Sequence, residues 1–158
     1  MKLIFIYGII LSSLFARVIY AQEIDYVLKG NEEALIGNIE KAIQYYQIDI
    51  RKNPDSIAGR VGLAKCYSSR GYMSMVDNIV GQILARQGDN IDALLLLAKV
   101  KTENKEWSEV ESIAKKVINI DKSNIKAHVH LRNALYQSGN PVDAESINKT
   151  LKKIMENK

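Results

Sequence analysis

The residues of this sequence best suited to metal binding or nucleophilic chemistry are two histidines and one cysteine. His128 and His130 are two positions apart on a predicted helix, so their side chains point about 200° apart around its axis. One metal ion cannot bind both of them, as it can a pair spaced by four residues. Carboxylates are scattered, and a pair such as Glu32 and Glu33 fits a solvated helix face.

Other arrangements that carry chemistry are also missing from the sequence. It contains no glycine-rich phosphate loop, no Cys/His ligand set, and no serine or cysteine with an evident base. Cys66 is the only cysteine of the chain, so no intramolecular disulfide can form even in an oxidising compartment. Its helical surroundings favour a small core residue. We therefore expect no enzyme, no metal site and no cofactor.

Residues 1–21 have the layout of a secretory signal peptide. A basic start precedes an apolar run over residues 3–16, and the segment ends on the small residue Ala21. We expect cleavage after Ala21, with Ala16 as a second candidate. An uncleaved anchor is the alternative, although Arg17 interrupts an apolar run that is short of the roughly 20 residues a spanning helix needs. Either alternative predicts a protein outside the cytoplasm, periplasmic or secreted from a bacterium, or anchored to the membrane by this segment.

The charge balance does not point to nucleic acid. The whole chain has 22 basic and 18 acidic residues, a net charge of +4. Lys2 and Arg17 lie in the predicted signal peptide, which has no acidic residue, so 20 basic and 18 acidic residues remain and the net charge falls to +2. A surface so nearly neutral provides no strong electrostatic attraction for phosphates. The common Lys, Glu, Ile, Leu and Ala residues and only two prolines favour helices.

A pattern with a period of 34 residues runs through the rest of the chain. Three sets of residues recur at this spacing: Gly37, Gly71, Lys105 and Gly139; Ala42, Val76, Val110 and Ala144; and Asp49, Ile83, Val117 and Leu151. A fixed period in this range is typical of a solenoid, in which no unit can bury its own apolar face alone. A domain over residues 23–158 is thus predicted to contain four repeats: 23–56, 57–90, 91–124 and 125–158.

Each repeat is predicted to be a pair of helices joined by a turn. In the second repeat, apolar residues recur at helical spacing on both sides of Gly71, and Gly88 ends the second helix. In the fourth, Pro141 suits the first position of a helix. The predicted fold class is therefore all-α, an α-solenoid of antiparallel helix pairs. The alternative is an unrelated helical bundle that is periodic by chance.

The pattern resembles tetratricopeptide repeats, a family of 34-residue helix-turn-helix units. The places that carry the resemblance hold Leu63, Leu97 and Leu131 (seventh), Gly30, Ala64 and Ala98 (eighth), Ala42 and Ala144 (twentieth), Tyr46 (twenty-fourth) and Pro54 (thirty-second). The resemblance implies a superhelix that binds a protein or an extended peptide in its concave groove. Lys29 and Glu33 depart from the apolar pattern in the first repeat, as expected of a solvated end.

By the same resemblance, the fifth, ninth and twelfth places of each repeat face the groove. The predicted partner-binding residues are Val27, Asn31, Val61, Lys65, Leu95, Lys99, Thr102, Val129, Asn133 and Tyr136. They form an apolar strip beside a polar row, in which asparagines can bond a peptide backbone and lysines favour a carboxylate or an acidic segment. The alternative is that the valines pack between helices and the lysines are merely solvated.

One family activity is not expected. Repeats of this family that clamp an acidic chaperone tail use Lys and Asn in one first helix, Asn in the next, and Lys and Arg in the third. The matching places here hold Val27 and Asn31, then Gly62, then Asp92 and Leu96. The clamp is therefore absent.

A second function class remains open, that of a structural subunit or assembly factor of an envelope complex. No capping helix is predicted after the fourth repeat, so Leu151, Ile154 and Met155 could form a partly exposed apolar edge. Such an edge would favour self-association through the end of the solenoid rather than peptide binding in the groove.

Overall fold

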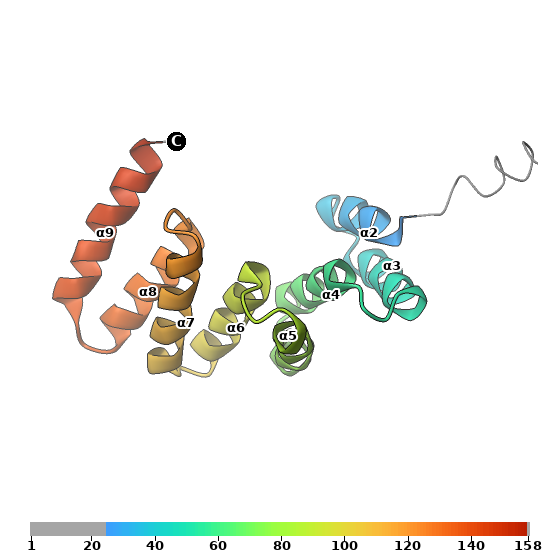
Figure 1. Cartoon of the computed structure of the whole chain (residues 1–158), viewed down its shortest axis with the longest axis horizontal. Coiled ribbons are helices and arrows are strands. Elements are labelled where there is room, and N and C mark those ends of the chain that lie inside the picture. The colour runs from blue at the N-terminus through green and yellow to red at the C-terminus, as the bar shows by residue number, and fades with distance from the viewer. Residues whose placement is uncertain (1–24, 158) are drawn as a thin grey trace, which may run out of the picture.

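The computed structural model describes residues 25–157, which form eight α-helices arranged as consecutive antiparallel pairs (Figure 1). The helices are α2 (Tyr26–Leu35), α3 (Ile39–Lys52), α4 (Ile57–Ser69), α5 (Met73–Arg86), α6 (Ile91–Glu103), α7 (Trp107–Ile120), α8 (Ile125–Gln137) and α9 (Pro141–Glu156). The predicted all-α fold is thus confirmed. The predicted signal peptide lies outside the described residues. None of the helices that are described is long and apolar enough to cross a membrane.

The turn inside every pair has the same backbone conformation. Its central residue is left-handed, with φ of 84° at Gly37, 77° at Gly71, 59° at Lys105 and 79° at Gly139. In each turn the amide of the next residue bonds back to a carbonyl five positions earlier, as from Tyr72 to the Tyr67 oxygen at 3.0 Å. This is the Schellman arrangement, which satisfies carbonyls at the helix end. Lys105 adopts the same left-handed conformation, although this conformation is less favourable for a lysine than for a glycine.

The first helix of each of the last three pairs begins with a side-chain cap. Ser56, Asn90 and Asn124 are 34 residues apart, and their side-chain oxygens accept from amides three residues on, at 3.0, 3.0 and 3.1 Å. In the first pair, Asp25 has this role for the amide of Leu28 at 2.9 Å. Each cap satisfies one of the amides that a helix start leaves open.

Burial is strictly local along the chain. Each described helix packs against its sequence neighbours, and α2, α4, α6 and α8 also contact one another in succession. The second helices provide most of the completely buried side chains, among them Val76, Val80 and Ile83 of α5. The two ends, α2 and α9, therefore share no contact and lie at opposite ends of an elongated array (Figure 1).

The predicted apolar edge at the end of the solenoid is only partly present. Leu151 is 5% exposed, so its assignment to an exposed edge was wrong. It occupies the place of Ile83 and Val117, and α8 is sufficient to cover it. Ile154 is half-buried, and Met155 remains exposed at 57%.

At the other end, Lys29 and Glu33 interrupt the apolar pattern of the first repeat. The two side chains have different environments. Lys29 is exposed, as a solvated end requires. Glu33 is half-buried instead and accepts from Asn38 Nδ2 at 2.8 Å and from Lys41 Nζ at 2.9 Å. These two bonds lower the pKa of the Glu33 carboxyl, the Asn38 bond having the larger effect.

Replacing Lys105 by glycine should stabilise the protein. The left-handed conformation strains a lysine, so we expect Lys105→Gly to raise the free energy of unfolding by about 0.5–1 kcal/mol in urea titrations. The reciprocal change, Gly71→Lys, should lower it by a similar amount. A destabilised Lys105→Gly variant would contradict this account of the turn.

Leu151 and Met155 should respond differently to truncation. Leu151→Ala leaves a cavity and should cost about 2–5 kcal/mol of unfolding free energy. Met155→Ala, on the exposed side of the same helix, should change it by no more than about 0.5 kcal/mol. Equal effects in thermal unfolding would show that the end of α9 is not packed as described.

Candidate functional site

The first helices of the pairs define a concave face. Neighbouring first helices contact one another, whereas α3, α5, α7 and α9 make no contact among themselves. The first helices are thus the closer spaced of the two layers, and a stack of such units curves toward its closer-spaced side. The inner surface is therefore formed by α2, α4, α6 and α8, which follow one another along the array (Figure 1).

Two adjacent hollows open where the first repeat meets the second. The apolar hollow has a volume of about 450 Å³ and is lined by Ala34, Leu35, Ile39, Cys66 and Ser69. The polar-edged hollow measures about 460 Å³ and is lined by Val27, Ile57, Ala58, Val61, Asn90 and Asp92. Asn31, Tyr46, Gly62 and Lys65 belong to both, so the two form one continuous depression.

The depression exists because the Tyr46 ring lies against two glycines. A Cβ atom at Gly30 of α2 or at Gly62 of α4 would overlap the ring. The Tyr46 hydroxyl donates to Asn31 Oδ1 at 2.7 Å, which fixes the ring, and burial raises the pKa of this phenol. The ring thus occupies the space that a side chain at Gly62 would need, and it lines both hollows.

At the next interface, the larger side chain comes from the first helix instead of the second. Val80 and Leu96 occupy the places of Tyr46 and Gly62 one repeat later, and they pack together in one core cluster. A large residue on the second helix thus faces a small one on the next first helix, or the reverse. Such compensation keeps the interface filled, because cores tolerate exchanges that conserve volume.

The two lysines predicted to face the groove are already engaged. Lys65 Nζ lies 2.9 Å from Asp92 Oδ1, in an exposed ion pair. Lys99 is half-buried and donates to the Ser68 oxygen at 3.2 Å and to Ser68 Oγ at 2.9 Å. Burial lowers the pKa of His130, and nearby Lys99 lowers it further. The groove is therefore less cationic than the residue types alone indicate.

The ten predicted groove residues fall into two groups. Val27, Asn31, Val61 and Lys65 line the depression. The remaining six lie on the third and fourth repeats: Leu95, Lys99, Thr102, Val129, Asn133 and Tyr136.

Several of these side chains have structural partners. Val61 is buried in the core, and Leu95 packs against the cluster of the third repeat. Thr102 Oγ1 donates to the Ala98 oxygen at 2.7 Å, and Asn133 accepts from Arg132. Val61 therefore packs between helices, as the alternative interpretation of the apolar strip predicts. The role of the strip in partner binding stays a prediction.

Most residues that line the apolar hollow are not among the predicted groove residues. Tyr46 is predicted only as the twenty-fourth place of the first repeat, and Leu35, Cys66 and Ser69 are not predicted at the groove. One signal was present, since Gly62 stands where Leu28 and Leu96 stand in other repeats.

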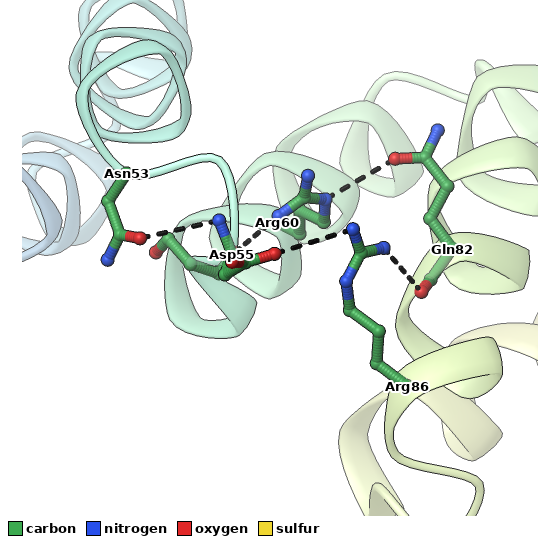
Figure 2. Close-up of polar contacts among 6 residues, drawn as sticks. Asn53, Asp55, Arg60, Gln82 and Arg86 are labelled. Atoms are coloured by element: carbon green, nitrogen blue, oxygen red, sulfur yellow. Dashed lines mark hydrogen bonds and ion pairs between the residues drawn. The ribbon is translucent and has the colours of Figure 1, made fainter.

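A second polar cluster joins α4 to α5 but has the character of a structural junction (Figure 2). Arg60 is 8% exposed, and it donates from Nη1 to the Ser56 oxygen at 3.0 Å and from Nε to Gln82 Oε1 at 3.3 Å. Arg86 lies 3.5 Å from Asp55 Oδ1 and donates to the Gln82 oxygen. Both arginines thus have acceptors inside the chain, and the cluster ties the loop before α4 to the next helix.

Two of the residues suited to chemistry, Cys66 and His128, lie in the core, as predicted for Cys66. Cys66 is 4% exposed, and burial raises the pKa of its thiol. His128 is buried, with Nδ1 at 2.9 Å from the Asn124 oxygen. Among residues 25–157, no group of three or more His, Cys, Asp or Glu side chains is placed to hold a metal ion.

Solved structures match this chain in fold, while no protein-family model and no curated protein matches it in sequence. MamA 41-end from Desulfovibrio magneticus RS-1 superposes with a TM-score of 0.74 at 13% identity, covering 84% of this chain and 75% of that one. TTC0263, a thermophilic TPR protein of Thermus thermophilus, gives 0.71 at 12% identity, covering 84% and 74%. The chain has the tetratricopeptide-repeat fold.

One similar structure contains a bound peptide. The first TPR of Spaghetti (RPAP3), bound to the HSP90 peptide SRMEEVD, matches with a TM-score of 0.68 at 16% identity, covering 72% of this chain and 90% of that one. At these identities the likeness establishes the fold alone.

The fit between Tyr46 and Gly62 can be tested by exchanging their sizes. Gly62→Leu forces a side chain into the ring and should cost about 1–3 kcal/mol of unfolding free energy. Tyr46→Val removes buried contacts and should also destabilise. The double variant reproduces the Val80–Leu96 pair, so it should recover part of the loss, with a coupling of about 0.5–3 kcal/mol.

A glycine elsewhere provides the control for this experiment. Gly81 is exposed in α5, and a Cβ there would meet nothing within 4 Å. Gly81→Ala should therefore stabilise the protein by about 0.5–1 kcal/mol. Additive losses in the Tyr46 and Gly62 variants would show that the two residues do not determine each other's size.

Proposed function

We propose that this protein is an exported, non-catalytic interaction module that binds a partner protein or an extended peptide on its concave face. The observation that carries the proposal is the continuous depression formed by the two hollows on the inner side of the first and second repeats. A depression with apolar walls and a few polar groups is the usual form of a ligand site. The SRMEEVD complex of the Spaghetti (RPAP3) repeats supports peptide binding as a use of this fold.

The partner is not expected to be an acidic chaperone tail. The clamp residues are absent from their places, and Asp92 adds a carboxylate to the edge of the depression. The Lys65–Asp92 pair and the Ser68 bonds of Lys99 also reduce the attraction that two lysines would exert on an acidic segment. A partner with a strongly acidic stretch therefore fits the groove poorly.

Export is part of the proposal and rests on residues 1–21 alone. The segment has the basic start, the apolar run and the small final residue of a signal peptide. Mass spectrometry of the protein from its native cells should find a mature N-terminus directly after Ala21, or after Ala16. An intact Met1 on membrane-bound protein would favour the anchor, and an intact Met1 on cytoplasmic protein would exclude export.

The runner-up is a structural subunit that acts through its outer or end surfaces. The end of α9 supports it less than the sequence indicated, since Leu151 is buried. Exposed apolar side chains do remain outside the groove, including Tyr72, Met75 and Met155. Positions on these surfaces can therefore be compared with positions in the groove to distinguish the two functions.

Photo-crosslinking in native cells should distinguish the groove from the other surfaces. We expect a photoreactive amino acid at Lys65 or Tyr136, on first helices, to capture one common partner. The same group at Met75 on α5 or Met155 on α9 should not capture it, because these residues lie on second helices. All four positions are exposed, so the changes should leave the fold intact. Capture from Met75 or Met155 alone would replace the groove function by the structural one.

A further inference from the structure

We infer that the apolar hollow is an anchor site for one bulky aliphatic or aromatic side chain on an extended, locally uncharged segment of the partner protein. The inference rests on the proposed function, because it specifies what enters the groove. It also specifies where the anchor side chain binds, which is at the junction of α2, α3 and α4.

The walls of the hollow are the first reason. Ala34, Leu35, Ile39 and Cys66 present carbon and sulfur atoms to a space of about 450 Å³ above the Tyr46 ring. This is within the size range of ligand sites and ample for one large side chain. Leu35 stands at the rim with 86% of its surface exposed, so an apolar ligand would also cover a leucine that is otherwise in water.

The charges around the hollow are the second reason. Lys65 is the one charged residue in its lining, and its ammonium is paired with Asp92 Oδ1 at 2.9 Å. A carboxylate entering the hollow would compete with Asp92 and lose water, and a second cation would meet Lys65 directly. Burial of an unpaired charge is costly, whereas a neutral side chain escapes both effects.

Polar groups lie beside the hollow rather than in it. Asn31 borders both hollows, is exposed, and holds the Tyr46 hydroxyl. Asn90 and Asp92 stand at the edge of the neighbouring hollow. Asparagine can both donate to and accept from a peptide backbone. The backbone of an extended segment would thus lie along this polar border with its anchor side chain in the apolar hollow.

The anchor site should be specific to this junction. At the next interface Val80 and Leu96 stand in the places of Tyr46 and Gly62, and in the fourth repeat His130 stands in the place of Gly62. Gly62 cannot change without meeting the ring. We therefore expect a partner to need one anchor residue at this junction rather than a repeated motif.

Immobilised peptide pools provide the test. We would use dodecapeptides of Gly, Ser, Thr, Asn and Gln with one fixed central residue, and compare Leu, Ile, Met and Phe pools with Asp, Glu, Lys and Arg pools. The apolar pools should bind the purified protein about tenfold more tightly, which is the effect of burying one aliphatic side chain. Binding should also change little with salt, because no net charge is recognised.

Two pairs of variants locate the binding. Leu35→Ser removes a wall of the hollow and should abolish the preference for apolar pools, whereas Ile36→Ser, its exposed neighbour outside the lining, should preserve it. Ser69→Trp fills the hollow from its rim and should block binding. Glu103→Trp places the same ring at the matching exposed position of the third repeat and should not.

Cys66 reports directly on occupancy, because it is the only cysteine in the chain and lines the hollow. An apolar peptide at about ten times its Kd should slow its labelling by a disulfide reagent about tenfold, because only about a tenth of the protein is then free of peptide. Unchanged labelling at saturation would overturn the inference.

The remaining outcomes separate the anchor from the general function. Preference for an acidic or basic pool, insensitive to Leu35→Ser, would overturn the anchor and leave groove binding intact. Self-association in sedimentation that Leu35→Ser abolishes would assign the hollow to a second copy of this chain and overturn the inference. Failure of groove positions to crosslink any partner in cells would instead remove the proposed function itself.

Discussion

The whole structure depends on the fact that no helix pair can bury its own apolar face. Described helices contact only their sequence neighbours and the adjacent first helices, so α3, α5 and α7 are each covered by the next pair. This nearest-neighbour burial fixes the order of the units and leaves the first helices closer together than the second ones. The concave face is therefore a consequence of how the core is covered, and it exists before any ligand is considered.

At the junction of the first and second repeats, the packing of the core also shapes the proposed binding site. The Tyr46 ring approaches the backbones of Gly30 and Gly62 because neither has a side chain, and the bond to Asn31 holds it there. The ring and Gly62 also line both hollows of the inner face. Other junctions use a smaller residue on the second helix and a larger one on the next first helix, as with Val80 and Leu96.

Pairing between repeats then determines the chemistry of the open face. Lys65 and Asp92 come from consecutive first helices, and Lys99 reaches back to Ser68 on the preceding one. Each contact brings together residues about 30 positions apart, a distance that the solenoid closes by stacking. The two lysines of the groove therefore bond to neighbouring repeats, and the apolar hollow is the most distinctive feature of the groove.

The sequence by itself determined the period, the helix pairs and the turns, because all of these depend on residues close together in the chain. Gly37, Gly71, Lys105 and Gly139 were found from spacing, and all four have positive φ. The burial of Cys66 was predicted from its helical surroundings. Only the tertiary structure decided that Leu151 is covered, that the groove lysines are engaged, and that Tyr46 and Gly62 leave a hollow. These features depend on side chains of different repeats meeting in space, and a one-dimensional register places such residues on a face without showing what they touch.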